Sequence, residues 1–197
     1  MAFADPVRLI GKTATLTPLL QVHRTDLAAA VCDGELWNLW YTSIPTAENV
    51  SAEIDRRLTL QQSGSMLPFA VIENTSGKAV GMTTYLNIDA ENRRLEIGGT
   101  WYRRSVQRSP LNTECKLMLL THAFEQLRCI AVEFRTHFLN RQSRAGIERL
   151  GAKLDGVLRQ HQLGHNGTLR DTCVYSILDR EWAAVKQNLS YRPVMPR

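Results

Sequence analysis

The stretch RRLEIGGTWYRRSVQRSPLNTECKLMLLTHAFEQL, at residues 93–127, decides the fold of this chain. Its first part alternates with the period of a half-buried strand, and one face of that strand would hold Leu95, Ile97, Gly99 and Trp101. Its last part places apolar residues at helical spacing, and these residues are Leu117, Leu120, Phe124 and Leu127. The stretch therefore predicts a strand, a short loop and an amphipathic helix.

The loop between these two elements, residues 107–112, is polar and cationic. Ser109 followed by Pro110 fits an N-cap and a first helical residue, because the missing N–H of proline costs nothing at that position. Unpaired N–H groups and the helix dipole meet at such a helix start, and together they favour a bound anion. An ordinary strand–loop–helix connection has the same spacing, so the pattern alone leaves both interpretations open.

Composition indicates a single domain over residues 1–197 with a sizeable core, since 44% of the 197 residues are hydrophobic. The net charge of +5 favours anionic ligands such as phosphates. Without a clustered basic stripe it does not indicate a nucleic-acid partner. No apolar run suits a signal peptide or a membrane span. The four cysteines form no C-x-x-C pair, so we expect reduced thiols in a cytoplasmic protein; they are Cys32, Cys115, Cys129 and Cys173.

The rest of the chain alternates between the two periodicities. Strands are predicted at residues 13–19, 69–73, 79–86, 131–136, 153–160 and 170–178, with a polar turn at 87–92. Helices are predicted at 23–31, after Thr46, after Asn140 and after Asp179. His161 and His165 are predicted to lie in a glycine-rich loop. No further metal ligands surround them in the sequence, so no metal site is expected.

The densest aromatic stretch is LWNLWYTSIP, at residues 36–45. Two tryptophans and a tyrosine in a segment that ends at proline are suited to filling the core. They are equally suited to lining a substrate pocket. The residues alone do not decide between these two interpretations.

Residues 93–127 resemble motif A of the GNAT superfamily, the acetyl-CoA-dependent N-acetyltransferases. From Thr13 to about Leu189 the chain resembles the branch that acetylates the N-termini of ribosomal proteins. In that family a strand bearing Glu precedes a loop of pattern Gln/Arg-x-x-Gly-x-Gly/Ala, which opens the helix that holds the coenzyme A pyrophosphate. Gln107 matches the first position, whereas Pro110 and Asn112 replace the two small residues. The resemblance implies an α/β GNAT fold, a mixed and mostly antiparallel sheet of about seven strands with helices on both faces.

The resemblance also implies roles for residues of the central strand. Glu96 corresponds to the glutamate that deprotonates the acceptor amine, directly or through water. Burial would raise its pKa toward that of a useful base, although an exposed glutamate at a sheet edge would explain the residue equally well. The pair Gly98-Gly99 indicates a bulge or a close backbone approach. In the family this strand splays from the next, so Gly99 and Thr100 are expected to contact the thioester.

Other cofactor contacts are expected at the helix starts. Asn140 and Ser143 fall one turn apart, which a capping box explains without any ligand. The resemblance implies that Asn140 contacts the pantetheine arm and that Ser143 lies near the sulfur, where it could protonate the thiolate. The pyrophosphate is expected against Gln107, Arg108, Ser109, Pro110, Leu111, Asn112 and Thr113. Pro110 removes one N–H donor, which the Arg108 charge could replace.

The expected function is transfer of acetyl from acetyl-CoA to a primary amine, by direct attack in a ternary complex. The preferred acceptor is a protein or peptide α-amine, and Trp37 and Tyr41 are the candidates to line its pocket, because the family uses this segment for that purpose. A small-molecule amine is the first alternative. A non-catalytic acyl-CoA-binding regulatory module is the second, motivated by the altered loop. The expected partners are coenzyme A and the amine-bearing acceptor, without a membrane, and a homodimer is left open.

Overall fold

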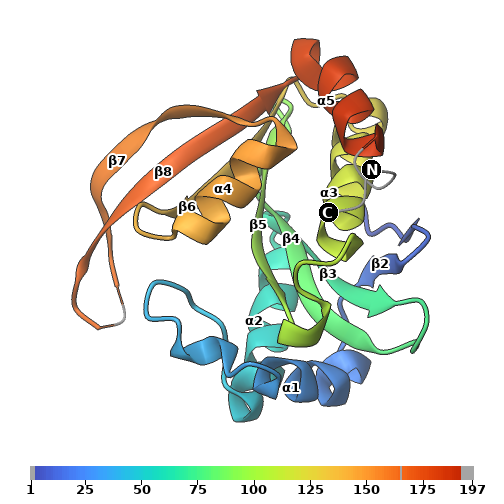
Figure 1. The fold of residues 1–197 in the computed structure, drawn as a ribbon, viewed down its shortest axis with the longest axis vertical. Helices are drawn as coiled ribbons and strands as arrows, with labels where there is room; N and C mark the ends of the chain where they lie inside the picture. Colours follow the sequence, from blue (N-terminus) through green and yellow to red (C-terminus); the bar gives the residue numbers. More distant parts are fainter. Residues whose placement is uncertain (1–2, 165, 192–197) are drawn as a thin grey trace.

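The computed structural model describes residues 3–164 and 166–191, and it contains one eight-stranded sheet of order β1-β2-β3-β4-β5-β6-β8-β7 (Figure 1). The strands are β1 (Leu9–Ile10), β2 (Ala14–Pro18), β3 (Met66–Glu73), β4 (Ala79–Asp89), β5 (Arg94–Tyr102), β6 (Ala131–His137), β7 (Lys153–Leu163) and β8 (Leu169–Leu178). The sequence predicted about seven, and the additional strand is the two-residue β1, which pairs with β2.

The sheet is antiparallel except between β5 and β6, which are parallel. A helix connects these two strands, as a parallel pair requires. The mixed, mostly antiparallel α/β architecture predicted from the sequence is therefore confirmed. Because β5 and β6 point the same way, the segments that follow both strands meet at one end of the pair.

Helices cover both faces of the sheet (Figure 1). One face carries α1 (Arg24–Cys32) and α2 (Val50–Gln62), whose apolar residues pack against Ala70, Met82 and Trp101. The other face carries α3 (Leu111–Thr121), α4 (Arg141–Leu150) and α5 (Asp179–Tyr191). Short 3₁₀ turns lie at Gln21–His23, Leu36–Asn38, Ala47–Asn49 and Arg104–Val106, and a π-helical turn, His122–Gln126, continues α3.

The larger of two apolar clusters lies under α3, α4 and α5 and fixes the central strand. Leu95 and Ile97 of β5 are buried there against Leu119 of α3 and Trp182 of α5. Each such side chain contributes roughly 1.5–3 kcal/mol relative to exposure. The alternation of the sequence thus specifies which face of β5 is covered by α3, and it leaves Glu96 on the opposite face.

Two sequence predictions about loops are wrong. The turn expected at residues 87–92 begins later, because β4 continues through Asn87 to Asp89. Asn87 takes a left-handed backbone (φ 46°), which asparagine tolerates, and its side-chain amide donates to Glu96. His161 was expected in a loop but lies in β7, with its Nδ1 3.2 Å from the Thr172 hydroxyl. His165 lies outside the described residues.

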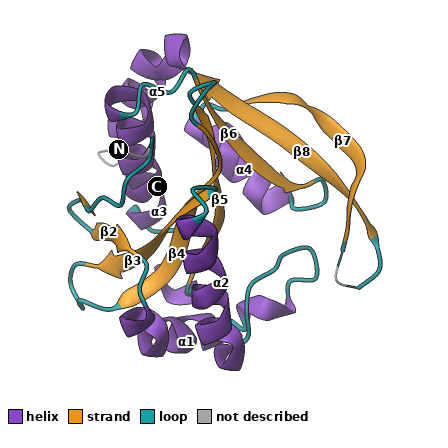
Figure 2. Cartoon of the chain, turned by 180° about the vertical axis from the view of Figure 1, so that it is seen from behind, coloured by secondary structure: helices purple, strands orange, loops and turns teal. Residues whose placement is uncertain are grey.

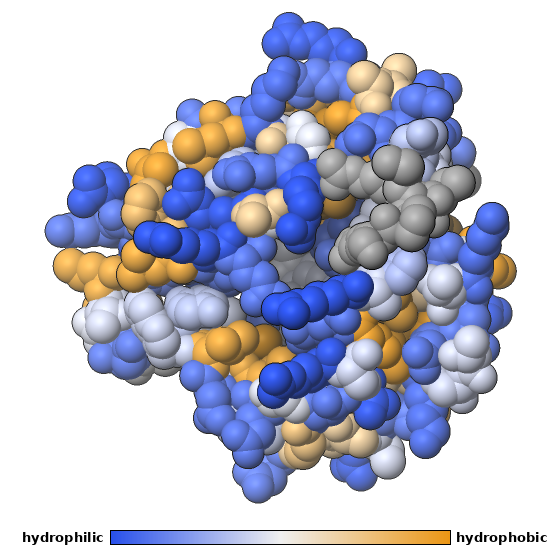
Figure 3. All heavy atoms as spheres, in the orientation of Figure 1, coloured by the Kyte–Doolittle hydropathy of each residue, from blue (hydrophilic) through white to orange (hydrophobic). Residues whose placement is uncertain are grey.

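The hairpin of β7 and β8 extends away from the helices (Figure 2). Several of its leucines are exposed, namely Leu154, Leu158, Leu163 and Leu169. Figure 3 shows apolar side chains gathered at the left of an otherwise mostly hydrophilic face, on the side of this hairpin. Within residues 3–164 and 166–191, no helix has the length and apolar character needed to cross a membrane. In the same ranges, no group of three or more His, Cys, Asp or Glu side chains could hold a metal ion.

Candidate active site

The candidate active site lies where β5 and β6 separate. The two strands pair over only three residues each, Arg94 to Glu96 with Ala131 to Glu133. Beyond that point β5 continues to Tyr102 and β6 continues to His137 without pairing to each other. The facing edges then carry backbone N–H and C=O groups that need other partners. This wedge is the separation that the family resemblance led us to expect, and it suits an extended ligand.

A β-bulge interrupts β5 at the wedge. Met82 pairs with Trp101 and Thr84 pairs with Gly98, so two residues of β5, Gly99 and Thr100, face one residue of β4. Gly99 has a φ of 55°, a conformation that glycine adopts without a steric penalty. The bulge predicted from the glycine pair is therefore present.

The bulge corrects the predicted face of the strand. The sequence placed Trp101 on the same face as Leu95 and Ile97, but the extra residue reverses the alternation. Trp101 packs against α1 and α2, while Leu95 and Ile97 pack under α3. The side chain of Thr100 consequently points toward α3, on the same side as Tyr102.

Glu96 is buried at the start of the wedge, with 6% of its surface exposed. Its Oε2 accepts a hydrogen bond from the Asn87 amide at 2.8 Å and lies 3.6 Å from Nε of Arg135. Burial raises the pKa of this carboxyl, an effect that Arg135 and Asn87 oppose. A Cβ on Gly98 would lie 2.7 Å from Oε1 of Glu96, so glycine leaves room for the carboxylate. Glu96 is therefore a buried carboxylate with the raised pKa of a candidate base, as predicted.

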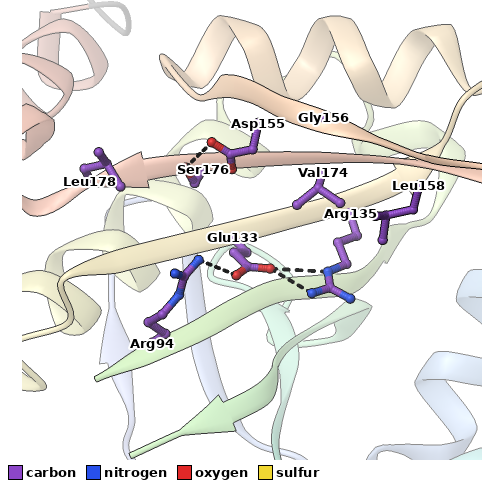
Figure 4. A pocket seen from close by; sticks show the side chains of 9 residues that line it. All are labelled: Arg94, Glu133, Arg135, Asp155, Gly156, Leu158, Val174, Ser176 and Leu178. Atoms are coloured by element: carbon purple, nitrogen blue, oxygen red, sulfur yellow. Dashed lines mark hydrogen bonds and ion pairs between the residues drawn. The ribbon is translucent and has the colours of Figure 1, made fainter. Parts of the chain in front are cut away.

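An open groove of about 460 Å³ lies on the sheet face opposite α4, and it is lined in part by Arg135, the residue 3.6 Å from Glu96 (Figure 4). The part of the groove formed by β5 and β6 is lined by Arg94, Glu133 and Arg135. Two ion pairs connect these residues, and Glu133 takes part in both. Glu133 accepts from Arg94 at 2.6 Å and from Arg135 at 3.0 Å. Val174 and Ser176 line the groove from β8, and Leu158 lines it from β7. Glu96 itself does not line the groove, so the groove reaches only the arginine that is paired with the buried carboxylate.

The loop after β5, residues 103–110, leads to the start of α3, and we call it the Gln107 loop. The Gln107 amide donates to the carbonyl of Tyr102 at 2.8 Å, so this side chain ties the loop to the strand. The helix begins at Leu111 with Pro110 in the N-cap position, one residue later than predicted. The Ser109 hydroxyl still accepts the N–H of Leu111, at 3.3 Å. It also donates to the carbonyl of Val106.

One residue of this loop adopts a backbone conformation that is typical of glycine. Arg108 has a φ of 61°, the left-handed conformation that glycine adopts most readily. Asn112 is exposed and Thr113 is half-buried in the first turn of α3, where helical geometry supplies no carbonyl for their N–H groups. The helix start therefore presents backbone donors to an anion, although Pro110 removes one of them.

The start of α4 lies at the end of β6, across the wedge from the Gln107 loop. Asn140 is the N-cap, and its Oδ1 accepts the Ser143 N–H at 3.0 Å. This confirms the capping interaction, and it leaves the Asn140 amide group as a donor. Gly151 ends the helix in the left-handed conformation, as predicted.

Trp37 and Tyr41, the two residues predicted to line the acceptor pocket, lie in different surroundings. Trp37 is half-buried against the cluster under α1 and α2, so it contributes to the core. Tyr41 instead lies beside Trp40 and His137, with ring centroids 5.5 Å and 6.2 Å away. The structure therefore brings Tyr41 to the end of β6 and does not place Trp37 with it.

The sequence prediction missed His137 and Trp40. His137 ends β6 and is buried, and its Nδ1 accepts the N–H of Leu139 at 3.0 Å. Burial lowers the pKa of this imidazole, and Arg170 lowers it further. The ring of Trp40 lies 5.2 Å away, edge to face. The only sign of His137 in the sequence was its position shortly before the Asn140 cap. Its contact with Trp40 could not be predicted, because the two residues lie far apart in the sequence.

Two buried cations were also missed. Arg57 of α2 reaches the Gly99 carbonyl from one side of the sheet, and Lys116 of α3 reaches the Thr100 hydroxyl from the other. Both belong to helices that were predicted from capping residues and apolar periodicity, and neither signal indicates the polar contacts of a buried side chain.

The family model for the acetyltransferase (GNAT) domain matches residues 14–153, which include the wedge, the Gln107 loop and the start of α4. The chain belongs to the GNAT acetyltransferases.

Individual GNAT relatives agree with this assignment. A GCN5-related N-acetyltransferase from Brucella melitensis has a TM-score of 0.84 and 31% identity, and the match covers 95% of this chain and 85% of that chain. RimJ from Mycobacterium smegmatis, solved with CoA-disulfide, shares the fold with a TM-score of 0.78 at 19% identity, over 96% of this chain and 93% of that one. A Bacillus subtilis (strain 168) protein named "Putative ribosomal N-acetyltransferase YdaF" is 36% identical over 110 residues. That match covers 56% of this chain, and the chain spans 59% of YdaF. The predicted resemblance to the ribosomal branch is confirmed.

The division of the aromatic stretch leads to a test by thermal melting of two variants of this GNAT protein. Trp37→Ala should destabilise it, toward the lower end of the roughly 3–5 kcal/mol typical of tryptophan truncation, because the ring is half-buried. Tyr41→Ala should leave the melting temperature nearly unchanged and raise the KM for the acceptor. A larger loss of stability in the tyrosine variant than in the tryptophan variant would show that the assignment is reversed.

Proposed function

We propose that this GNAT protein transfers an acetyl group from acetyl-CoA to the α-amine of a protein or peptide. The main supporting observation is the buried Glu96, whose pKa is raised where the wedge opens. A carboxylate in that position can accept a proton from an amine that approaches along the groove. Glu96 is the last residue of β5 that pairs with β6, so its carboxylate lies next to the point where the two strands separate.

The cofactor is proposed to bind across the ends of β5 and β6. Its pyrophosphate would meet the N–H groups of Asn112 and Thr113 at the start of α3, with the left-handed backbone of Arg108 shaping the loop. Its pantetheine arm would use the unpaired strand edges of the wedge, with the Asn140 amide as a side-chain donor. The acyl group would then lie against the bulge at Gly99 and Thr100.

The proposed reaction is direct attack of the amine nitrogen on the thioester carbonyl carbon. A C–N bond forms and the C–S bond breaks, and the electron pair of the broken bond leaves on the coenzyme A sulfur. The amine proton passes to Glu96, directly or through water. A backbone N–H at the bulge stabilises the charge on the acyl oxygen, and Ser143 or solvent protonates the thiolate.

The shape of the groove favours a chain end as the acceptor. The groove lies open on the sheet face beside Arg135, the partner of Glu96, and continues across β6 and β8, which suits an extended peptide. Tyr41, Trp40 and His137 would cover the end of the site nearest β6. A cytoplasmic location belongs to the same proposal, since the cysteines are free thiols and three of them are buried.

The acceptor is tested by comparing a peptide library that has free N-termini with a panel of small amines, using release of free coenzyme A as the measurement. Peptide turnover that is lost on N-terminal blocking supports the proposal. Turnover confined to small amines would replace the proposed acceptor. Coenzyme A binding without turnover of any amine would instead identify a regulatory module.

Glu96→Gln should slow turnover by roughly 10²-fold or more, because general-base catalysis contributes about 10²–10⁴-fold. The loss should shrink at high pH, where the amine deprotonates unaided. The raised pKa also means that the folded state keeps this proton to higher pH than the unfolded state does, so Glu96 opposes folding at neutral pH. The variant should therefore melt at the same or a higher temperature.

Glu91→Gln, in an exposed turn, is the matched control for the glutamate variant and should change neither property. Equal turnover of Glu96→Gln and wild type across the pH range would exclude Glu96 as the base.

Asn112→Asp tests the anion site at the start of α3. The added charge should stabilise the helix start by roughly 0.3–1 kcal/mol in the apo protein. Against a bound pyrophosphate the same charge is repulsive, so coenzyme A should bind more weakly. Calorimetric titration and a thermal melt measure the two opposite effects. Asn188→Asp on α5 is exposed, adds the same charge, and should leave the affinity unchanged. Equal affinities in all three proteins would locate the pyrophosphate elsewhere.

A further inference from the structure

Lys116 is a lysine buried between α3 and the sheet, with 7% of its surface exposed. Its ammonium donates to the Thr100 hydroxyl at 2.7 Å and to the Thr83 hydroxyl at 3.4 Å. The two hydroxyls lie 2.8 Å apart and also hydrogen-bond to each other. Neutral hydroxyls offset only part of the cost of burying a charge. Burial accordingly lowers the pKa of Lys116 to about 8.

Among residues 3–164 and 166–191, the ionisable groups around Lys116 do not cancel its charge. The sheet and α3 turn Tyr85, Tyr102 and Cys115 toward the same core, and burial raises the pKa of all three, so they are neutral at physiological pH. Glu114 is adjacent in sequence, but its carboxylate accepts the backbone N–H groups of residues 12–14 at the β1–β2 turn. Lys116 is thus a cation held against the bulge by hydroxyl groups.

The opposite side of the bulge is held differently. Arg57 donates to the Gly99 carbonyl at 3.4 Å and to the Thr84 hydroxyl at 2.5 Å. Its charge is paired with Glu53 at 2.6 Å. Two buried cations therefore hold adjacent residues of the bulge from opposite faces of the sheet, and Arg57 is the one paired with a carboxylate.

This arrangement fixes the direction of the bulge backbone. In a trans peptide the C=O and N–H groups point in opposite directions, so holding the Gly99 carbonyl against Arg57 also directs the Thr100 N–H. The Thr100 hydroxyl lies 3.4 Å from the Gly98 carbonyl, which restrains the preceding peptide. A change at Lys116 would consequently reach the backbone through Thr100.

We propose that Lys116 is a positioning residue for acetyl transfer. Through Thr100 it holds the bulge in the conformation that binds the acyl oxygen, and its positive charge supports the negative charge that develops there. The inference rests on the proposed function. In it, the side chain of Lys116 on α3 supports the backbone of the bulge. The inference also gives a functional reason for burying a lysine at a place where its charge opposes folding.

The test compares the wild type with Lys116→Met and Lys116→Arg, and Lys78→Met in an exposed turn is the control. Lys116→Met should lower kcat about tenfold, less than the roughly 10²–10³-fold loss on removing an oxyanion donor itself. Acetyl-CoA affinity should stay nearly unchanged. The melting temperature of the apo protein should hold or rise, because the variant removes a charge whose burial is unfavourable. Loss of stability with unchanged kcat would show a structural role and overturn the inference.

The pH dependence of kcat/KM distinguishes the effect of the Lys116 charge from the effect of its packing. In the wild type kcat/KM should fall above about pH 8, as Lys116 loses its proton. Lys116→Arg should keep activity there, because a guanidinium remains protonated. Lys78→Met should follow the wild type throughout. An alkaline fall that persists unchanged in Lys116→Arg would overturn the proposed role of the charge.

An amide resonance tests the inference without turnover. The ¹⁵N–¹H signal of Thr100 in the apo protein should titrate near pH 8 in the wild type and not in either Lys116 variant. If the wild type acetylates no amine, the proposed function fails, and this titration still decides whether Lys116 controls the bulge. A Thr100 signal that is insensitive to pH in the wild type would overturn the inference even if the enzyme is active.

Discussion

The β-bulge at Gly99 is the constraint on which the site depends. Its extra residue reverses the alternation of β5, which places Trp101 under α1 and α2 while Leu95 and Ile97 stay under α3. One strand is thereby anchored to both helical layers. The same insertion lies where β5 and β6 have already separated. The bulge thus accounts for the packing of β5 against both helical layers, and it lies beside the backbone groups that the separation of β5 from β6 leaves unpaired.

The site concentrates charges that a stable core would avoid. Burial raises the pKa of Glu96 and lowers that of Lys116, so each group opposes folding at neutral pH. The apolar cluster around Leu119 and Trp182 must offset both effects. Such compensation is common where a catalytic group needs an environment that disfavours its charge.

The sequence predicted the parts of this structure that follow from local periodicity, and it missed those that depend on distant contacts. The strand, the crossover helix, the bulge and the Asn140 cap each have a local signal, and each is present. The face of Trp101 was predicted wrongly, because a bulge can be expected from a glycine pair without showing which later residues it reverses. Lys116 and His137 gave no usable signal, because their partners are 16 and about 100 residues away in the sequence.

The loop before α3 differs from the family pattern at Pro110 and Asn112, where the family has small residues. A loop that binds an anion needs a suitable backbone conformation and free N–H donors, and these are separate requirements. Glycine usually satisfies the first of them. Here Arg108 adopts the left-handed conformation itself, at a modest energetic cost for a residue with a Cβ. The Ser109 hydroxyl satisfies the Leu111 N–H, and this leaves the next N–H groups of the first turn for a ligand. The loop therefore combines one left-handed residue with the N–H groups of the first helical turn, and Pro110 contributes no N–H of its own.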